Sequence, residues 1–203
     1  MKKIITIQHT QSVHHTNGMV GSWTDWPLTA LGTHQAHLIG KKLSKEIKDH
    51  VVMYTSDLLR AKQTAMIVAG YLEVDPIINP VLRERNLGIA VGKSVEWLNQ
   101  HKQKDEVTVD DRLFEDAESK RNVYDKLKPF YEMLIKSQHD TIIVVSHGDT
   151  LSIFNALWLN MPIEMYDHCG LFGLAGGVSY LQKAHDGKHL IRKLSDMSYV
   201  MEE

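Results

Sequence analysis

The sequence has very little cysteine and no long apolar stretch. Its 203 residues include a single cysteine, Cys169, so no disulfide can form within the chain and a reducing compartment is expected. The apolar run after Lys2 and Lys3 stops at Gln8, too early for a secretion signal, and no later run approaches a membrane span. These features predict a cytoplasmic protein without a membrane partner.

An excess of charge of one sign is also lacking. Lysine and arginine number 23 against 25 acidic residues, so no nucleic-acid partner is expected. Histidine is abundant, with 12 residues, and His34 and His37 are spaced to share one face of a helix. No Cys-x-x-Cys or His-Glu-x-x-His pattern supplies further ligands, so we expect no metal site and no cofactor.

Strand and helix patterns alternate along the chain. Apolar runs typical of strands occupy residues 3–7, 51–55, 141–146, 178–182 and 190–194. Apolar residues at helical spacing follow Thr29, Ser56 and His147. A longer helix is expected over residues 117–136, with a kink or a break at Pro129.

This order of elements predicts an α/β fold in three layers, α/β/α, with a mostly parallel but mixed sheet. The last two strands, joined across Asp186-Gly187-Lys188, are expected to form a hairpin. The length suits one buried core, and no linker or internal repeat divides the chain. Residues 1–203 are therefore predicted to form a single domain.

Polar side chains follow several predicted strands at the point where the strand ends. His9 follows the first strand, Arg60 lies near the start of the helix after the second, and His147 follows the strand at 141–146. Taken singly, His9 and Arg60 are better explained as solvated side chains. Because parallel strands bring their carboxyl ends to one edge of a sheet, we expect these residues to meet, with Glu84 reaching in from its loop. Two histidines, a guanidinium and a carboxylate suit a phosphoryl group.

Five segments resemble motifs of the histidine phosphatase superfamily, in the branch that contains the cofactor-dependent phosphoglycerate mutases. They are QHTQS from Gln8, SWTDWPLTALG from Ser22, SDLLRAKQTA from Ser56, LRERNLG from Leu82 and VSHGD from Val145. The resemblance covers nearly the whole chain. It implies a phosphoglycerate mutase-like fold and an enzyme that works without a metal.

The resemblance also implies a role for each candidate catalytic residue. His9 would attack phosphorus and carry the phosphoryl group as a phosphohistidine. Arg60 and His147 would hold the phosphate oxygens, while Glu84 would protonate the leaving oxygen and later take a proton from water. The predicted function is hydrolysis of a small phosphomonoester through a phosphohistidine on His9.

The first motif departs from the family pattern. Gln8 stands where the family has arginine, and His15 stands where it usually has asparagine. We expect both to join Arg60 and His147 in binding phosphate. Losing one charge-assisted contact costs about 1.5–3 kcal/mol, or roughly a tenfold to hundredfold slower step.

Two alternatives to a working hydrolase stay open. One is a catalytically impaired family member that binds a phosphorylated ligand without useful turnover. The other is a phosphomutase, which must exclude water from the phosphohistidine. The chain is short for a mutase and has no obvious long lid insertion, so hydrolysis is the preferred prediction. The sequence does not predict an oligomeric state.

Overall fold

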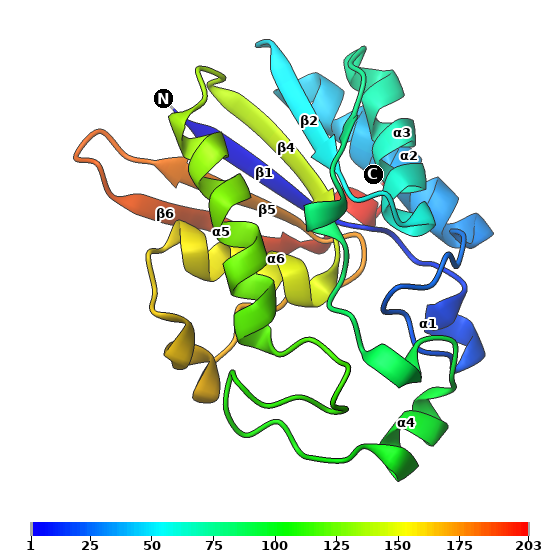
Figure 1. Cartoon of the computed structure of the whole chain (residues 1–203). Helices are drawn as coiled ribbons and strands as arrows, with labels where there is room; N and C mark the ends of the chain where they lie inside the picture. The colour runs from blue at the N-terminus through cyan, green and yellow to red at the C-terminus, as the bar shows by residue number, and fades with distance from the viewer. Residues whose placement is uncertain (1, 203) are drawn as a thin grey trace.

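A mixed sheet of six strands runs through the middle of the protein, with helices on both of its faces (Figure 1). The computed structural model describes residues 2–202. Its strands are β1 (Lys3–Gln8), β2 (Val51–Thr55), β3 (Ile77–Ile78), β4 (Thr141–Ser146), β5 (Val178–Lys183) and β6 (His189–Asp196). Their order across the sheet is β3-β2-β4-β1-β5-β6. The first four in this order are parallel to one another, β5 pairs antiparallel with β1, and β6 pairs antiparallel with β5.

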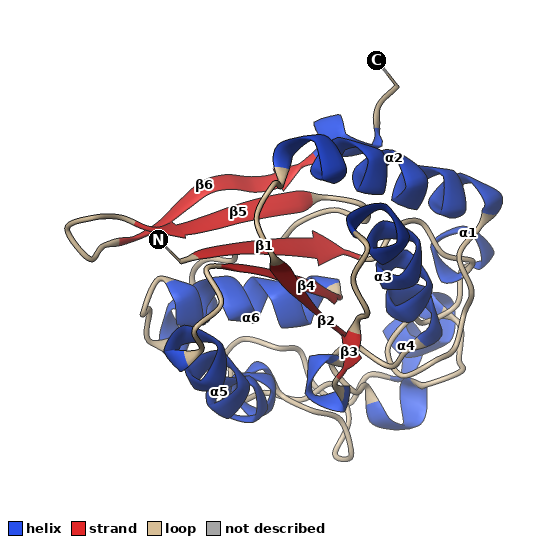
Figure 2. Ribbon diagram, turned by 90° about the horizontal axis from the view of Figure 1, so that it is seen from above, coloured by secondary structure: helices blue, strands red, loops and turns tan. Residues whose placement is uncertain are grey.

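Helices form the outer two layers, as the sequence predicted. The helices of the structure are α1 (His14–Asn17), α2 (Ala30–Glu46), α3 (Leu59–Leu72), α4 (Val95–His101), α5 (Lys120–Lys136) and α6 (Gly148–Trp158). Short 3-10 segments occur at Pro80–Leu82, Gly88–Ala90, Ile163–Asp167 and Met197–Val200. Helices α2 and α3 cover one face of the sheet, and α5 and α6 cover the other (Figure 2).

The central strands are apolar because both of their faces are covered. Side chains of a strand alternate between the two faces, so Ile5 packs with the α2 and α3 side of the core while Ile4 packs with the α5 and α6 side. All six residues of β4 are buried. A strand covered on both faces reads as a continuous apolar run rather than an alternating one, and IIVV is such a run.

A kink or a break was expected at Pro129, and the break does not occur, because helix α5 is continuous through this residue. The helix starts at Lys120, after a capping box formed by Ser119 and Asn122, and continues through Pro129 to Lys136. Pro129 itself is exposed. Buried apolar side chains on both sides of it, including Leu127 and Leu134, hold the two halves against the sheet. Tertiary packing of an apolar face thus outweighs one lost backbone hydrogen bond.

Strand β3 and helix α4 were not predicted. Strand β3 consists only of Ile77 and Ile78, both exposed, and two residues are too few to form a periodic pattern. Helix α4 buries no residue fully. No helix within residues 2–202 combines the length and the apolar character needed to cross a bilayer.

Candidate active site

Two histidines lie side by side at the carboxyl edge of the sheet. Strands β1 and β4 are parallel and in register from Lys3 with Thr141 to Gln8 with Ser146, so the residues that follow them emerge together. The His9 N–H donates to the Ser146 carbonyl at 2.9 Å. The ring centroids of His9 and His147 are 5.1 Å apart, and both residues are buried.

The tautomer of His9 follows from its neighbours. Its Nδ1 lies 2.8 Å from the Thr10 carbonyl oxygen, which only accepts, so Nδ1 carries the proton. Nε2 therefore keeps its lone pair, and it accepts a hydrogen bond from Arg60 Nε at 3.1 Å. Burial, and then the Arg60 guanidinium, lower the pKa of His9 well below its usual value. The ring is therefore neutral at pH 7, with its lone pair on Nε2.

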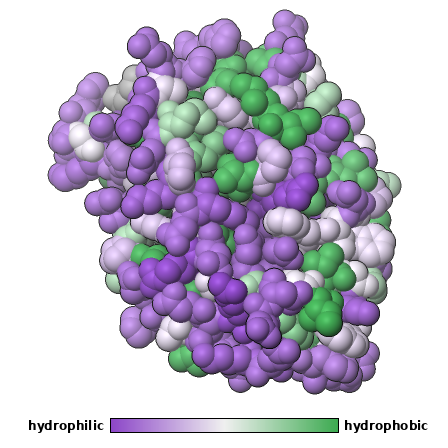
Figure 3. Space-filling view, in the orientation of Figure 1, coloured by the Kyte–Doolittle hydropathy of each residue, from purple (hydrophilic) through white to green (hydrophobic). Residues whose placement is uncertain are grey.

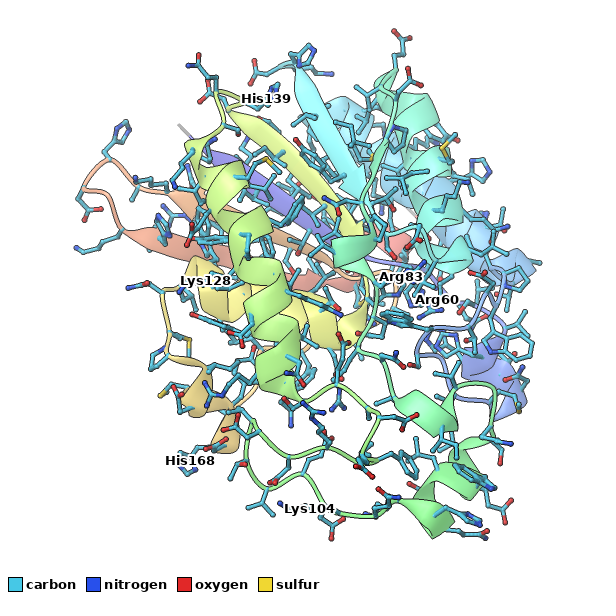
Figure 4. The ribbon with its side chains drawn as sticks, viewed as in Figure 1. Arg60, Arg83, Lys104, Lys128, His139 and His168 are labelled. Atoms are coloured by element: carbon cyan, nitrogen blue, oxygen red, sulfur yellow. The ribbon has the colours of Figure 1, made fainter. Side chains whose placement is uncertain are left out.

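Arg60 is the second residue of α3 and is almost fully buried. Its guanidinium donates to the carbonyls of Thr24, at 2.7 Å, and Ser22, at 2.8 Å, in addition to His9. Burial lowers the pKa of Arg60 to about 10, so the group remains charged at neutral pH. In the view of Figure 4, Arg60 and Arg83 both appear beyond the carboxyl ends of β2 and β4. Arg83 faces a different partner, the carboxylate of Asp57.

Glu84 approaches from the loop after the 3-10 segment at Pro80–Leu82. Its carboxylate accepts from the backbone N–H groups of Arg85, at 2.9 Å, and Thr150, at 3.2 Å, in the first turn of α6. Burial and then the nearby Asp149 carboxylate raise the pKa of Glu84 above its usual value. A carboxyl whose pKa is raised stays protonated to higher pH, which is what a general acid requires.

His147 holds no hydrogen bond through its ring. Both ring nitrogens are buried and have no hydrogen-bond partner among residues 2–202. Burial, followed by the Arg60 guanidinium, lowers the pKa of His147 well below its usual value, so the ring is neutral. A buried polar group without a partner costs about 1–3 kcal/mol. A ligand oxygen that accepts from this ring would recover that cost.

His15 and its neighbour His14 stand over the His9 ring. The His15 ring stacks on that of His9, with centroids 5.4 Å apart and an angle of 11° between planes. The Ser12 N–H donates to His15 Nδ1 at 3.1 Å, so the proton of the neutral His15 ring lies on Nε2. The His14 ring is 5.7 Å from that of His9. Burial lowers the pKa of His14 to about 3, and the neighbouring His15 ring contributes less to this shift. Burial also lowers the pKa of His15, with a smaller contribution from the Arg60 guanidinium.

Gln8 lies at the end of β1, half-buried, with its amide beside two glycines. A Cβ atom at Gly148 would lie 3.4 Å from Gln8 Nε2, and one at Gly173 would lie 3.5 Å from Gln8 Oε1. The structure thus brings His15, Arg60 and His147 each into contact with His9. The binding roles predicted for these residues and for Gln8 remain predictions.

Sequence reasoning assigned no role to Arg85, although it is 7% exposed and ties three segments together. Its Nε donates to Asp149 Oδ2 at 2.7 Å, and its two terminal nitrogens pair with the carboxylate of Glu106. Burial alone would lower the pKa of Arg85, but these two carboxylates raise it. A single sequence gave no indication of this network, because its partners are 21 and 64 residues away.

Comparison with known proteins adds the family context. The model of the histidine phosphatase superfamily (branch 1) matches residues 4–195. "Probable phosphoglycerate mutase GpmB" of Serratia proteamaculans (strain 568) is 29% identical over 80% of this chain and 77% of its own length. Further proteins of that name match over about half of their own length.

Solved structures show the same fold. A mycobacterial glucosyl-3-phosphoglycerate phosphatase in complex with VO3 has a TM-score of 0.82 at 18% identity, covering 96% of this chain and 99% of its own. A phosphoserine phosphatase of Entamoeba histolytica, in complex with phosphoserine, has a TM-score of 0.81 at 20% identity, covering 99% and 100%. These matches confirm the predicted phosphoglycerate mutase-like α/β fold.

Proposed function

The chain belongs to the histidine phosphatase superfamily (branch 1), and we propose that it hydrolyses phosphomonoesters through a phosphohistidine on His9. Family membership confirms the broader prediction, an enzyme of the phosphatase or mutase class. The more specific assignments, the residue roles and the preference for water as acceptor, are the proposal.

The proposed reaction has two displacements at phosphorus. In the first, His9 Nε2 forms a bond to phosphorus while the ester oxygen leaves and takes a proton from Glu84. In the second, water attacks the phosphohistidine, Glu84 takes a proton from that water, and the bond between nitrogen and phosphorus breaks. Inorganic phosphate and the alcohol are the products, and His9 and Glu84 return to their starting states.

Phosphoryl transfer depends mainly on fixed donors around the non-bridging oxygens. Arg60 would supply charged donors from a guanidinium already held by two carbonyls. His147 would supply a neutral donor from a buried ring whose nitrogens lack partners among residues 2–202. The neutral Nε2–H of His15 would add a third donor next to the His9 ring.

The fixed tautomer of His9 is the observation that carries the proposal. A buried, neutral imidazole whose Nδ1 proton is held by a carbonyl presents an unprotonated Nε2 at pH 7. A histidine that served only to bind phosphate would gain more from the opposite arrangement, with a proton on Nε2. The geometry therefore favours a nucleophile over a ligand-binding group.

A catalytically impaired phosphate binder is the second candidate, and Gln8 favours it. Gln8 stands where the family motif has arginine, so one charged donor is missing from the first motif. An amide contributes less than a guanidinium to holding a phosphate dianion. A mutase is the third candidate, since the GpmB relatives bear that name.

A substrate screen distinguishes these candidates. Phosphoserine, phosphoglycerate and glucosyl-3-phosphoglycerate come first, because proteins similar to this chain are named for them or bind them. We expect release of inorganic phosphate from a small phosphomonoester, and its loss in His9→Ala but not in His185→Ala, a change at an exposed histidine on the β5–β6 turn. Full activity in His9→Ala would refute the mechanism, and phosphate binding without any turnover would favour the impaired binder.

The cellular setting is also part of the proposal. The single cysteine supports a reducing, cytoplasmic location. Residues 1–203 are proposed to act as one domain, because one sheet carries both faces of the core. The partner would be a small phosphorylated metabolite.

A further inference from the structure

Three histidines at the site form a cluster of metal-binding type. His9, His14 and His15 each offer one ring nitrogen, and these nitrogens all lie within 4.8 Å of one another, the one such group found within residues 2–202. We propose that this histidine triad binds a transition-metal ion such as Zn²⁺ and that the bound ion inhibits the enzyme. The binding is independent of the proposed function, whereas the inhibition rests on it.

The donor set determines which ions fit. Neutral imidazoles suit zinc, copper and nickel, whereas magnesium and calcium prefer oxygen ligands. Three imidazoles with water in a fourth position form a common tetrahedral arrangement for zinc, with Zn–N bonds of about 2.0–2.1 Å. Tetrahedral geometry with such bonds places the nitrogens roughly 3.4 Å apart, so the rings must move closer together. Helix α1 permits this, because it has four residues and buries none of them.

Groups next to the rings would orient them for an ion. Metal-binding histidines usually donate the N–H of their second ring nitrogen to a carboxylate, a backbone carbonyl or water. His9 Nδ1 donates to the Thr10 carbonyl at 2.8 Å, and His14 Nδ1 lies 2.6 Å from Ser12 Oγ. His15 Nδ1 accepts a hydrogen bond from the Ser12 N–H, so this ring must give up that hydrogen bond when it binds an ion.

Some charged groups around the triad oppose the binding of a cation, and others favour it. Arg60 opposes it, because its Nε bonds to the same His9 Nε2 that an ion would use. The carboxyl groups of Glu84 and Asp25 lie close enough to act on Arg60 and partly offset its charge. Gln8 adds no positive charge at the position where the family motif has arginine. The balance predicts reversible binding rather than a permanent structural site.

Inhibition follows from which atom the ion would occupy. His9 has one unprotonated ring nitrogen, Nε2, because Nδ1 is protonated toward Thr10. An ion bound there removes the lone pair that would attack phosphorus. Zinc and phosphate should therefore compete for one site, and chelation should restore the full rate.

Direct zinc binding is the first test. Full-length protein without a histidine tag is titrated with Zn²⁺ by calorimetry, beside His14→Gln and the control His185→Gln, which changes an exposed histidine outside the triad. We expect one ion per wild-type chain, at least tenfold weaker binding in His14→Gln, and unchanged binding in His185→Gln. Equal zinc affinity in wild type and His14→Gln would overturn the proposal, provided that circular dichroism shows both folded.

Two further measurements separate the metal site from the proposed activity. Inorganic phosphate should weaken zinc binding in the wild type, and Mg²⁺ should give no heat at this site. If the protein hydrolyses a phosphomonoester, zinc should inhibit it, with at least a tenfold higher inhibition constant in His14→Gln, each variant being compared with its own zinc-free rate. Zinc binding without any hydrolysis would leave the site intact and refute only the proposed function. Hydrolysis insensitive to saturating zinc would overturn the inhibitory role.

Discussion

At Glu84, a half-buried residue, a carboxyl with a raised pKa lies beside the backbone N–H groups at the start of α6. Because a general acid matters most when the leaving group is poor, Glu84→Gln should slow hydrolysis of an alkyl phosphomonoester by on the order of 10²–10⁴-fold. The loss should be much smaller with para-nitrophenyl phosphate, whose leaving group needs little protonation. Comparing kcat/KM for the two substrates in both proteins tests this role. An equal loss with both substrates would show that Glu84 has another function.

Gln8 is the residue at which the first motif is predicted to differ from the family pattern, with glutamine in place of arginine. An arginine there would add a charged donor, so Gln8→Arg should raise kcat/KM by roughly tenfold or more. The flanking Gly148 and Gly173 carry no side chain beyond hydrogen and leave room beside position 8. Gln8→Met is the matched control, because it removes the amide without adding charge, and it should not raise the rate. An unchanged rate in Gln8→Arg would mean that position 8 does not reach the phosphate.

The candidate site residues differ in how far the sequence could predict them. His9, Arg60 and His147 stand next to strand ends, and the parallel order of strands makes their meeting predictable. Arg85 and the exact stacking of His14 and His15 were not predictable. Their importance arises from contacts between distant segments and from ring orientation, which no spacing in the sequence records.

Asp149, in the first turn of α6, lies close enough to Glu84 to act on its carboxyl group. The Asp149 carboxylate contributes to the raised pKa of Glu84, so Asp149→Asn should lower that pKa. Glu84 would then lose its proton at lower pH, and the alkaline side of the kcat/KM profile should move to lower pH. Glu106→Gln is the control, because it breaks the other pairing of Arg85 but keeps the charge at Asp149. A profile that moves equally in both variants would indicate general damage to the Arg85 network instead.

Helix α5 contains a residue in its middle, Pro129, that should lower the stability of the helix. Pro129 cannot donate the backbone hydrogen bond of that position, and its ring crowds the preceding turn. Pro129→Ala should stabilise the folded protein by about 1–3 kcal/mol, less the unfolded-chain entropy that proline removes. Urea unfolding measures this change, with Lys128→Ala at an adjacent exposed position as control. A destabilised Pro129→Ala would mean that packing against the sheet depends on a bend at this proline.

Most of the elements that the sequence predicted have a buried face, although strand β6, which has no fully buried residue, was also predicted. Strand β4 matches its predicted bounds because burial on both sides demands an apolar run. Strand β3 and helix α4 bury too little for such a pattern. Local capping could have identified α4, since the Ser94 side chain accepts from the Trp97 N–H at 3.0 Å, and serine is a favoured N-cap.

At the scale of the whole molecule, the sheet brings distant segments to one edge. The site draws on β1, α3, the loop at Glu84 and α6, and α1 and α4 lie on that same side of the molecule (Figure 1). The face seen in Figure 3 is largely hydrophilic, with its apolar side chains in separate groups. Because the site draws on several distant segments of the chain, a ligand bound there should stabilise the entire fold and not one loop.

Phosphate binding should accordingly raise the melting temperature of the protein. A ligand at 100 times its Kd adds about 2.7 kcal/mol of stability. For a chain of this size each kcal/mol shifts Tm by roughly 2–4 °C, so saturating phosphate or vanadate should raise Tm by about 5–10 °C. Arg60→Met should lose most of this shift, because its fork of donors is gone. Arg192→Met, at an exposed position on β6, should keep it.

The same measurement separates the enzyme from the impaired binder. Both hypotheses predict a Tm that depends on phosphate. Only the enzyme hypothesis predicts that the Tm shift caused by a hydrolysable phosphomonoester changes with time, because the ester is converted to products of different affinity. His9→Ala should stop that change with time while keeping a phosphate-dependent shift, because Arg60 and His147 remain. Wild type and His9→Ala that behave identically with every phosphomonoester tested would favour the binder. Absence of any shift with phosphate or vanadate, at concentrations up to solubility, would argue against both.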